Sequence, residues 1–206
     1  MRVTILCSDE KHPAWEMLRL WADNRYHLTS RLDDRHGDFL FLVSCTEKVP
    51  LEVRNNYQHT LVLHESDLPL NRGWSPLAWS ILGGANEITV SLFEATDEID
   101  AGPIWKKTHC RFEGHELSDE IQRRITKLKI ELMEDALLGP KRVVPQQGEA
   151  SYCTKRTPAD SEIDPQRPLA AQFDLLRICE RRFPAFFHLR GHRYEIMLKK
   201  NDNAAA

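Results

Sequence analysis

The sequence lacks the features that assign a protein to a membrane or nucleic-acid class. None of its apolar runs approaches the ~20 residues that a membrane-spanning helix needs. The formal net charge is −3, which disfavours a broad surface for nucleic acid or for an anionic membrane. The glycine-rich GxGxxG and P-loop patterns are both absent. We therefore expect no nucleic acid and no membrane among its partners.

Cysteines are few and follow no metal-binding or disulfide pattern. There are five, an odd number, with no CxxC pair. This usage is typical of reduced thiols rather than of disulfides or zinc ligands, so we expect no metal. The amino-terminal run MRVTILCS is broken at once by Ser8, Asp9 and Glu10, which is unlike a signal peptide. We expect a cytoplasmic protein.

The apolar pattern of the first third of the chain predicts an α/β fold. The chain has 206 residues, of which 41% are hydrophobic, enough for one domain with a real core. Near-continuous apolar runs predict buried strands at 2–8, 39–45 and 59–65. Helices are predicted between them at 12–24 and 50–57. This alternation is typical of a parallel sheet covered by helices.

The rest of the chain predicts further strands and helices and then a different kind of segment. Helices are predicted at 75–84 and 116–140, the second closed by Gly139-Pro140, and strands at 87–95 and 102–112. Residues 141–168 read as an extended segment over a surface, followed by a helix at 169–181 and a β-hairpin at 185–199. We expect one domain over 1–206, with an α/β core at 1–140 and the additional elements at 141–200.

Loops that leave the predicted strands are the places to look for chemistry, because open parallel sheets bind ligands beyond the carboxyl ends of their strands. Three loops qualify, at 44–50, 64–76 and 94–103. The second begins with His64, a proton carrier near neutral pH, and the third contains Asp100 and other acids. A carboxylate facing an imidazole orients it and stabilises its charged form. Taken singly, the histidine also fits a hydrogen-bonded boundary residue and the acids a polar turn.

Both loops resemble those of one enzyme family. Residues 63–105, LHESDLPLNRGWSPLAWSILGGANEITVSLFEATDEIDAGPIW, are similar to the core of the folate-dependent formyltransferases. The family's first loop has a histidine followed by Ser-x-Leu-Pro, Arg-Gly and Pro, and its second has an aspartate before x-Gly. TEKVP (46–50) resembles the family's pterin-cradling loop, and YCTKRTPADSEID (152–164) the segment after its catalytic core. The end of the chain, 173–196, is most similar to sugar N-formyltransferases of the pseudaminic-acid type.

The resemblance implies a Rossmann-like, mostly parallel sheet flanked by helices, and a direct transfer of a formyl group. An amine attacks the formyl carbon of 10-formyltetrahydrofolate, and tetrahydrofolate leaves. His64 is implied to take the amine proton or shield the oxyanion, and Asp100 to orient His64. The implied folate contacts are Ser44, Cys45, Thr46, Val49, Leu63, Ala95, Asp97 and Ile99. The implied substrate contacts are Arg72, Gly73, Trp74 and Ser75, although Arg72 fits a role in shaping its own loop equally well.

Two departures from the family pattern stand out. The family has an asparagine two residues before the histidine, where its amide bonds the formyl oxygen, but this chain has Val62. Losing an oxyanion donor costs about 10²–10³ in rate. A backbone N–H, Ser44, Thr46, Asn71 or protonated His64 would have to serve instead. Only 63 residues precede the histidine, so we expect one strand–helix unit of the amino-terminal half to be missing or compressed.

The expected acceptor is the amine of a nucleotide-linked amino sugar. Methionyl-tRNA is disfavoured by the negative charge and by the absence of room for a separate tRNA-binding domain. Two alternatives stay open: another folate-dependent reaction, either on a carrier-bound aminoacyl group or as hydrolysis of the donor, and a non-catalytic folate or nucleotide-binding module. The carboxyl-terminal hairpin, with Phe183, Phe186 and Phe187 nearby, is one candidate surface for a homodimer.

Overall fold

A six-stranded sheet forms the centre of the computed structural model, which describes residues 1–139 and 142–201. Its strand order is β2-β1-β3-β4-β6-β7. The strands are β1 (Val3–Leu6), β2 (His27–Thr29), β3 (Gly37–Val43), β4 (Tyr57–His64), β6 (Glu87–Glu94) and β7 (Ile104–Arg111). The first four in spatial order run parallel, whereas β6 is antiparallel to β4 and β7 is antiparallel to β6. The prediction of a mostly parallel, Rossmann-like sheet flanked by helices is confirmed.

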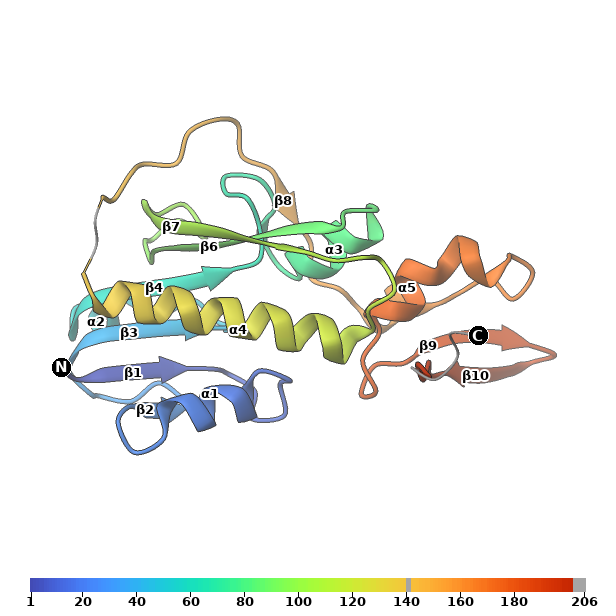
Figure 1. The fold of residues 1–206 in the computed structure, drawn as a ribbon, viewed down its shortest axis with the longest axis horizontal. Helices are drawn as coiled ribbons and strands as arrows, with labels where there is room; N and C mark the ends of the chain where they lie inside the picture. The colour runs from blue at the N-terminus through green and yellow to red at the C-terminus, as the bar shows by residue number, and fades with distance from the viewer. Residues whose placement is uncertain (140–141, 202–206) are drawn as a thin grey trace.

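Helices cover both faces of this sheet (Figure 1). They are α1 (Trp15–Ala22), α2 (Leu51–Arg54), α3 (Pro76–Leu82) and α4 (Ser118–Leu137). On one face α1 and α4 pack against alternate residues of the strands, including Ile5, Phe41 and Leu61, to form the largest core cluster. On the other face Val53 of α2 packs on a smaller cluster around Leu42. The 20-residue α4 was the clearest helix in the sequence, and of its predicted Gly139-Pro140 stop only Gly139 lies within the described residues.

The amino-terminal half contains one short strand that was not predicted. A strand that the sequence pattern did not reveal, β2, pairs with β1 at the edge of the sheet. Residues 30–36 then lead directly into β3 without helical structure. The three residues of β2 are half-buried and show no alternation of apolar and polar side chains that would mark a strand in the sequence.

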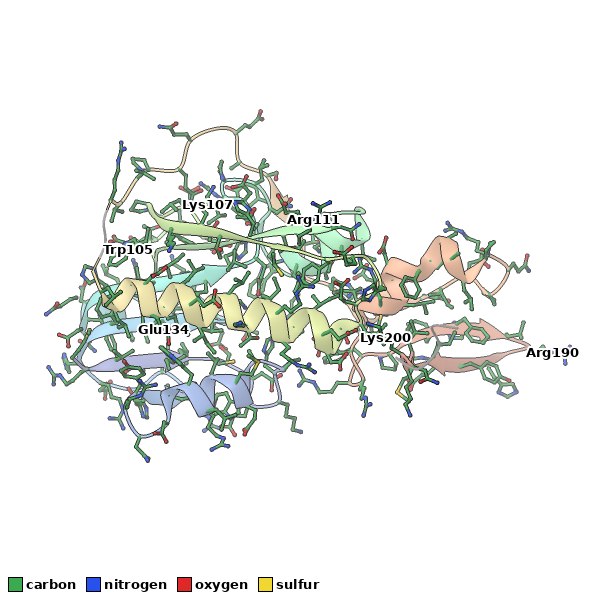
Figure 2. All side chains as sticks on the ribbon, viewed as in Figure 1. Trp105, Lys107, Arg111, Glu134, Arg190 and Lys200 are labelled. Atoms are coloured by element: carbon green, nitrogen blue, oxygen red, sulfur yellow. The ribbon has the colours of Figure 1, made fainter. Side chains whose placement is uncertain are left out.

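Residues 142–201 run back past the loops of the preceding α/β core and form a β-hairpin near their end. Residues 142–156, here called the strap, include the short β8 (Tyr152–Cys153), which pairs with β5 (Arg72–Gly73). The 3₁₀ helices η1 (Pro158–Ser161) and η2 (Leu169–Gln172) precede α5 (Phe173–Ile178), and β9 (Ala185–Leu189) pairs with β10 (His192–Ile196). The predicted extended segment and hairpin are confirmed, and Figure 2 places Arg190 at the hairpin's outer tip. The predicted helix at 169–181 is wrong in its extent, because its first turn is 3₁₀ and it ends at Ile178.

No helix in the described ranges has the length and apolar character to cross a bilayer. All five cysteines are free thiols. Within residues 1–139 and 142–201, no three His, Cys, Asp or Glu side chains gather in a manner that would hold a metal ion.

Candidate active site

A cavity of about 420 Å³ opens where β3 and β4 end. Its walls come from the loops after β1, β3, β4 and β6, together with the strap and the region after α5. Figure 1 shows the carboxyl ends of β1, β3 and β4 directed toward the carboxyl-terminal elements. The cavity therefore lies at the edge of the sheet where parallel strands leave room for a ligand.

His64 is the last residue of β4 and stands at the wall of this cavity. Its ring is almost fully buried, with Nε2 2.9 Å from the carbonyl oxygen of Asn71 and 3.7 Å from Oδ2 of Asp100. A carbonyl oxygen only accepts, so Nε2 must carry the hydrogen that it donates to Asn71. In the neutral ring the lone pair is then on Nδ1, which leaves that atom able to accept a proton.

Asp100 joins loop 94–103 to loop 64–76. Its Oδ2 accepts the backbone N–H of Gly73 at 2.7 Å, and its backbone has a left-handed φ of 52°. The side chain of Gln146, from the strap, donates to the carbonyls of Asp100 and Gly102, both at 2.8 Å. A Cβ on Gly102 would lie 1.8 Å from the carbonyl oxygen of Glu94, so this tight return of the loop requires glycine.

The sheet topology differs from the expectation in one respect that concerns Asp100. We predicted that loop 94–103 leaves a carboxyl end at the same edge as the other two loops. Because β6 is antiparallel to β4, this loop instead begins beside the middle of β4, where the N–H of Ala95 donates to the carbonyl of Thr60 at 2.8 Å. The loop then folds back along β4 to bring its carboxylate to His64.

Arg72 does not line the cavity, although it was a predicted substrate contact. It is 7% exposed, and its guanidinium bonds Glu98 at 2.7 Å and Gln146 at 2.8 Å. These contacts support the interpretation in which Arg72 shapes the loops and do not place it against a phosphate. Asp97, a predicted folate contact, also lies outside the cavity lining: its exposed carboxylate pairs with Arg54 of α2.

The other predicted contacts do line the cavity. They are Ser44, Cys45, Thr46, Val49, Leu63, Gly73, Trp74, Ser75, Ala95 and Ile99. Burial raises the pKa of the Cys45 thiol to about 12, so it stays protonated and acts as a packing group. Val62 also lines the cavity, on the same face of β4 as His64, because side chains two residues apart on a strand share a face.

The loop after β4 is held in place from the side of β7. Lys107, labelled in Figure 2, donates from Nζ to Asp67 Oδ1 and to the carbonyl of Leu68, both at 2.6 Å. The strap holds the end of the same loop, where the N–H groups of Asn71 and Arg72 donate to the side-chain oxygen and the carbonyl of Ser151. Both ends of the loop are therefore fixed before any ligand binds.

A buried ion pair beneath the cavity was not predicted. Lys129 of α4 is 1% exposed and pairs with Glu65, whose side chain is 16% exposed and lines the cavity. Burial alone would raise the pKa of Glu65, but the ammonium of Lys129 and then the ring of His64 outweigh it and hold that pKa below its usual range. The signal in the sequence was a lysine four residues after Ile125 and three before Leu132, on the apolar face of the long helix.

Other residues of the lining were also missed because they come from regions with no strong motif. His12 lies in the loop after β1, and its pKa is lowered to about 4 by burial and by the nearby ammonium of Lys129. The strap and the region beyond α5 add Lys155, Arg156, Glu180 and Phe183. Nothing local in the sequence indicated that these segments, so far along the chain, would reach the cavity.

Comparisons with known proteins agree with this arrangement. A sequence model of the family "Formyl transferase" matches residues 7–137. Among solved structures, methionyl-tRNA formyltransferase from Clostridium thermocellum is 24% identical, with a TM-score of 0.81 over 99% of this chain and 95% of that one. A 4-N formyltransferase from Francisella tularensis is 16% identical, with a TM-score of 0.71 over 98% of both chains.

A third similar structure belongs to a longer protein. HypX from Aquifex aeolicus, in complex with tetrahydrofolic acid, is 20% identical with a TM-score of 0.77. The match covers 96% of this chain but 37% of HypX. These structures share the fold, and the family model spans well over half of the sequence. The chain belongs to the formyl transferase family, as its two loop motifs predicted.

Proposed function

We propose that this protein transfers the formyl group of 10-formyltetrahydrofolate to the amine of a nucleotide-linked amino sugar, for example a UDP-4-amino-4,6-dideoxy sugar. The observation that carries the proposal is the meeting of His64 and Asp100, from two loops, at the wall of one cavity. A general acid–base pair at this place suits the transfer of a proton from an attacking amine. Family membership and the similarity to a 4-N formyltransferase support the reaction class.

The described side chains suggest how the reaction proceeds. The amine nitrogen attacks the formyl carbon, a tetrahedral intermediate forms, and the bond from that carbon to N10 of the folate breaks. Nδ1 of His64 takes the proton that the amine loses, and a proton is returned to N10 as tetrahydrofolate leaves. Asp100, 3.7 Å from Nε2, stabilises the charged ring while Asn71 fixes its orientation. Acid–base help of this kind is worth about 10²–10⁴ in rate.

Cationic and aromatic side chains on the strap side favour an acceptor that carries phosphate. Lys155 and Arg156 line the cavity, and the Lys155 ammonium lies 5.5 Å from the centre of the Trp74 ring. A diphosphate would pair with the cations, and a base or sugar ring would stack on the indole. These two residues take the role that the sequence interpretation had offered to Arg72.

Two alternatives have other substrates or no reaction. The first is another folate-dependent reaction, either formylation of a carrier-bound aminoacyl group or hydrolysis of the donor. The second is motivated by Val62, which offers no amide beside His64. A non-catalytic folate or nucleotide-binding module would need no proton carrier, so the His64–Asp100 pair argues against it. Turnover without an added amine distinguishes hydrolysis, and binding without turnover distinguishes the module.

The deciding experiment is incubation with 10-formyltetrahydrofolate and a panel of nucleotide-linked amino sugars. Mass spectrometry should show the gain of one formyl group on one sugar, in reactions that contain both donor and amine. Methionyl-tRNA and an aminoacyl carrier protein are included as competing acceptors. Formylation of either of these alone, or formate release at the same rate without any amine, would contradict the proposed substrate.

We further propose that the protein is cytoplasmic and that it forms a homodimer through its carboxyl-terminal hairpin. Of the three phenylalanines considered, Phe183 is 57% exposed, whereas Phe186 is buried and Phe187 is half-buried against the cluster around Ile163. Tyr194 and Met197 add exposed apolar surface. Light scattering after gel filtration should give the mass of a dimer, and Met197→Glu should shift it to that of a monomer.

A further inference from the structure

Ser44 brings a hydroxyl to the cavity in which Val62 offers no amide. Ser44 follows β3 directly, and its neighbour Val43 is in register with Leu63 of β4. His64 is the last residue of β4, whereas Ser44 has already left β3, with a left-handed φ of 53°. Both line the cavity, together with Val62.

The hydroxyl of Ser44 receives a hydrogen bond from a buried cation. Nζ of Lys129 lies 3.3 Å from Oγ of Ser44, and the same ammonium pairs with Glu65. Among the residues that the structure describes, Ser44 Oγ has no other partner. A hydroxyl that accepts from an ammonium has its own hydrogen turned away from that cation and made a stronger donor. This hydrogen is available to a ligand in the cavity.

We propose that the Ser44 hydroxyl donates a hydrogen bond to the formyl oxygen of the bound donor and to the oxyanion that replaces it in the tetrahedral intermediate. Lys129 is a positioning residue, because it acts on the reacting oxygen through Ser44. The Ser44 O–H bond stays intact throughout, and its hydrogen bond strengthens as negative charge develops on the oxygen. The inference rests on the proposed folate-dependent transfer and names the group that takes over from the family's asparagine.

The other candidates for this role are less well placed. The amide oxygen of Asn71 accepts from Ser151, and Asn71 is outside the cavity lining. The N–H of Thr46 donates to Ser8, and its side chain has no cation to polarise it among the described residues. The ring of His64 donates from Nε2 to the Asn71 carbonyl, and its Nδ1 is already assigned to the proton that the amine loses.

The first test compares Ser44→Ala with Ser30→Ala, a serine on the surface whose hydroxyl bonds Glu10. Ser44→Ala should lower kcat by about 10²–10³, as the loss of an oxyanion donor does, with the KM for the donor raised by no more than about fivefold. Ser30→Ala should match the wild type. Val62→Asn in the Ser44→Ala background should recover at least tenfold of the lost kcat, because it restores an amide donor beside His64. A Ser44→Ala variant within threefold of wild type, or one that changes only KM, overturns the proposal.

A second test works without knowledge of the acceptor. The stable donor analogue 10-formyl-5,8-dideazafolate and its deformylated form 5,8-dideazafolate are titrated into wild type and Ser44→Ala by calorimetry. If Ser44 bonds the formyl oxygen, the preference for the formylated ligand should fall by about fivefold in the variant. An unchanged preference overturns the assignment of Ser44 while leaving folate binding intact. Failure of the wild type to bind either ligand overturns both this inference and the proposed function.

Discussion

The parallel and antiparallel parts of the sheet contribute to the cavity in different ways. In the parallel part, β3 and β4 end side by side, so Ser44 and His64 come together through strand direction alone. In the antiparallel part, β6 runs the other way and its loop starts next to Thr60, part of the way back along β4. Asp100 reaches His64 only because that loop folds back.

The returning loop is held by side chains from elsewhere in the chain. Gln146 binds two of its carbonyls, Arg54 binds a third, and Arg72 pairs with Glu98. His64 is thus placed by sheet topology and Asp100 by a network of hydrogen bonds. The network is the more vulnerable of the two, because the loss of a single side chain releases part of it.

The largest expected effects come from His64 and Asp100, the two groups proposed to transfer the proton. His64→Asn and Asp100→Ala should each lower kcat/KM by about 10²–10⁴ with the fold intact, since each removes one member of the proton-transfer pair. Formyl transfer is measured by mass spectrometry and the fold by circular dichroism. The exposed His109→Asn and Asp119→Ala serve as matched controls. Near-wild-type rates in His64→Asn would remove the basis for the catalytic assignment.

The ion pair between Lys129 and Glu65, near the parallel part of the sheet, should have the largest effect on stability. Lys129→Met leaves Glu65 buried beside no cation and should lower the free energy of unfolding by about 3–5 kcal/mol. Lys127→Met on the same helix removes an exposed partner of Glu131 and should cost less than about 0.5 kcal/mol. Urea unfolding measures both. A double variant with Glu65→Gln should recover much of the loss, and equal costs for the two single variants would contradict this account of the pair.

The returning loop should respond to the removal of its brace. Gln146→Ala deletes the two bonds to the carbonyls of Asp100 and Gly102 and one from Arg72. We expect a loss of about 1–3 kcal/mol in stability and a kcat lower by about tenfold. Gln147→Ala, at the exposed next position, is the control and should match the wild type. A kcat unchanged in Gln146→Ala would show that Asp100 keeps its place without the strap.

An effect seen only at acid pH comes from His12. Its pKa is about 4 in the folded protein against an ordinary 6.5, so between these values the unfolded chain binds more protons. Stability is therefore complete above about pH 6.5 and is lost as the pH falls through this window, with a slope of at most about 1.4 kcal/mol per pH unit. His12→Gln should flatten the profile of urea midpoints between pH 4.5 and 6.5. The exposed His36→Gln should leave it as in the wild type, and identical profiles for both variants would contradict the buried, neutral state of His12.

The sequence predicted the elements with strong periodicity and three of the loops that line the cavity. The apolar strands ending at Val43 and His64, and the stripe of α4, each mark a buried face that reads directly from side-chain spacing. The motif loops then indicated which chain segments meet. Their agreement with the family pattern supplied what spacing alone left open.

The parts that the sequence did not reveal depend on tertiary contacts. The short β2 has no alternation of its own and exists because β1 offers it an edge. The direction of β6 has no local signal, so the origin of the Asp100 loop was misplaced. The loop motif contains Arg72 whether this arginine contacts the substrate or shapes its own loop. Its guanidinium is turned inward because it bonds Gln146, which lies 74 residues away in the sequence.

The strap has a consequence for where this protein can be divided. The family match ends at residue 137, before the segment that pairs with β5 and bonds the Asp100 loop. A fragment cut after α4 would retain every strand of the central sheet, yet the Arg72 guanidinium would lose Gln146 and the N–H groups of Asn71 and Arg72 would lose Ser151. The smallest unit able to keep its reactive groups aligned is thus longer than the unit that sequence comparison delimits.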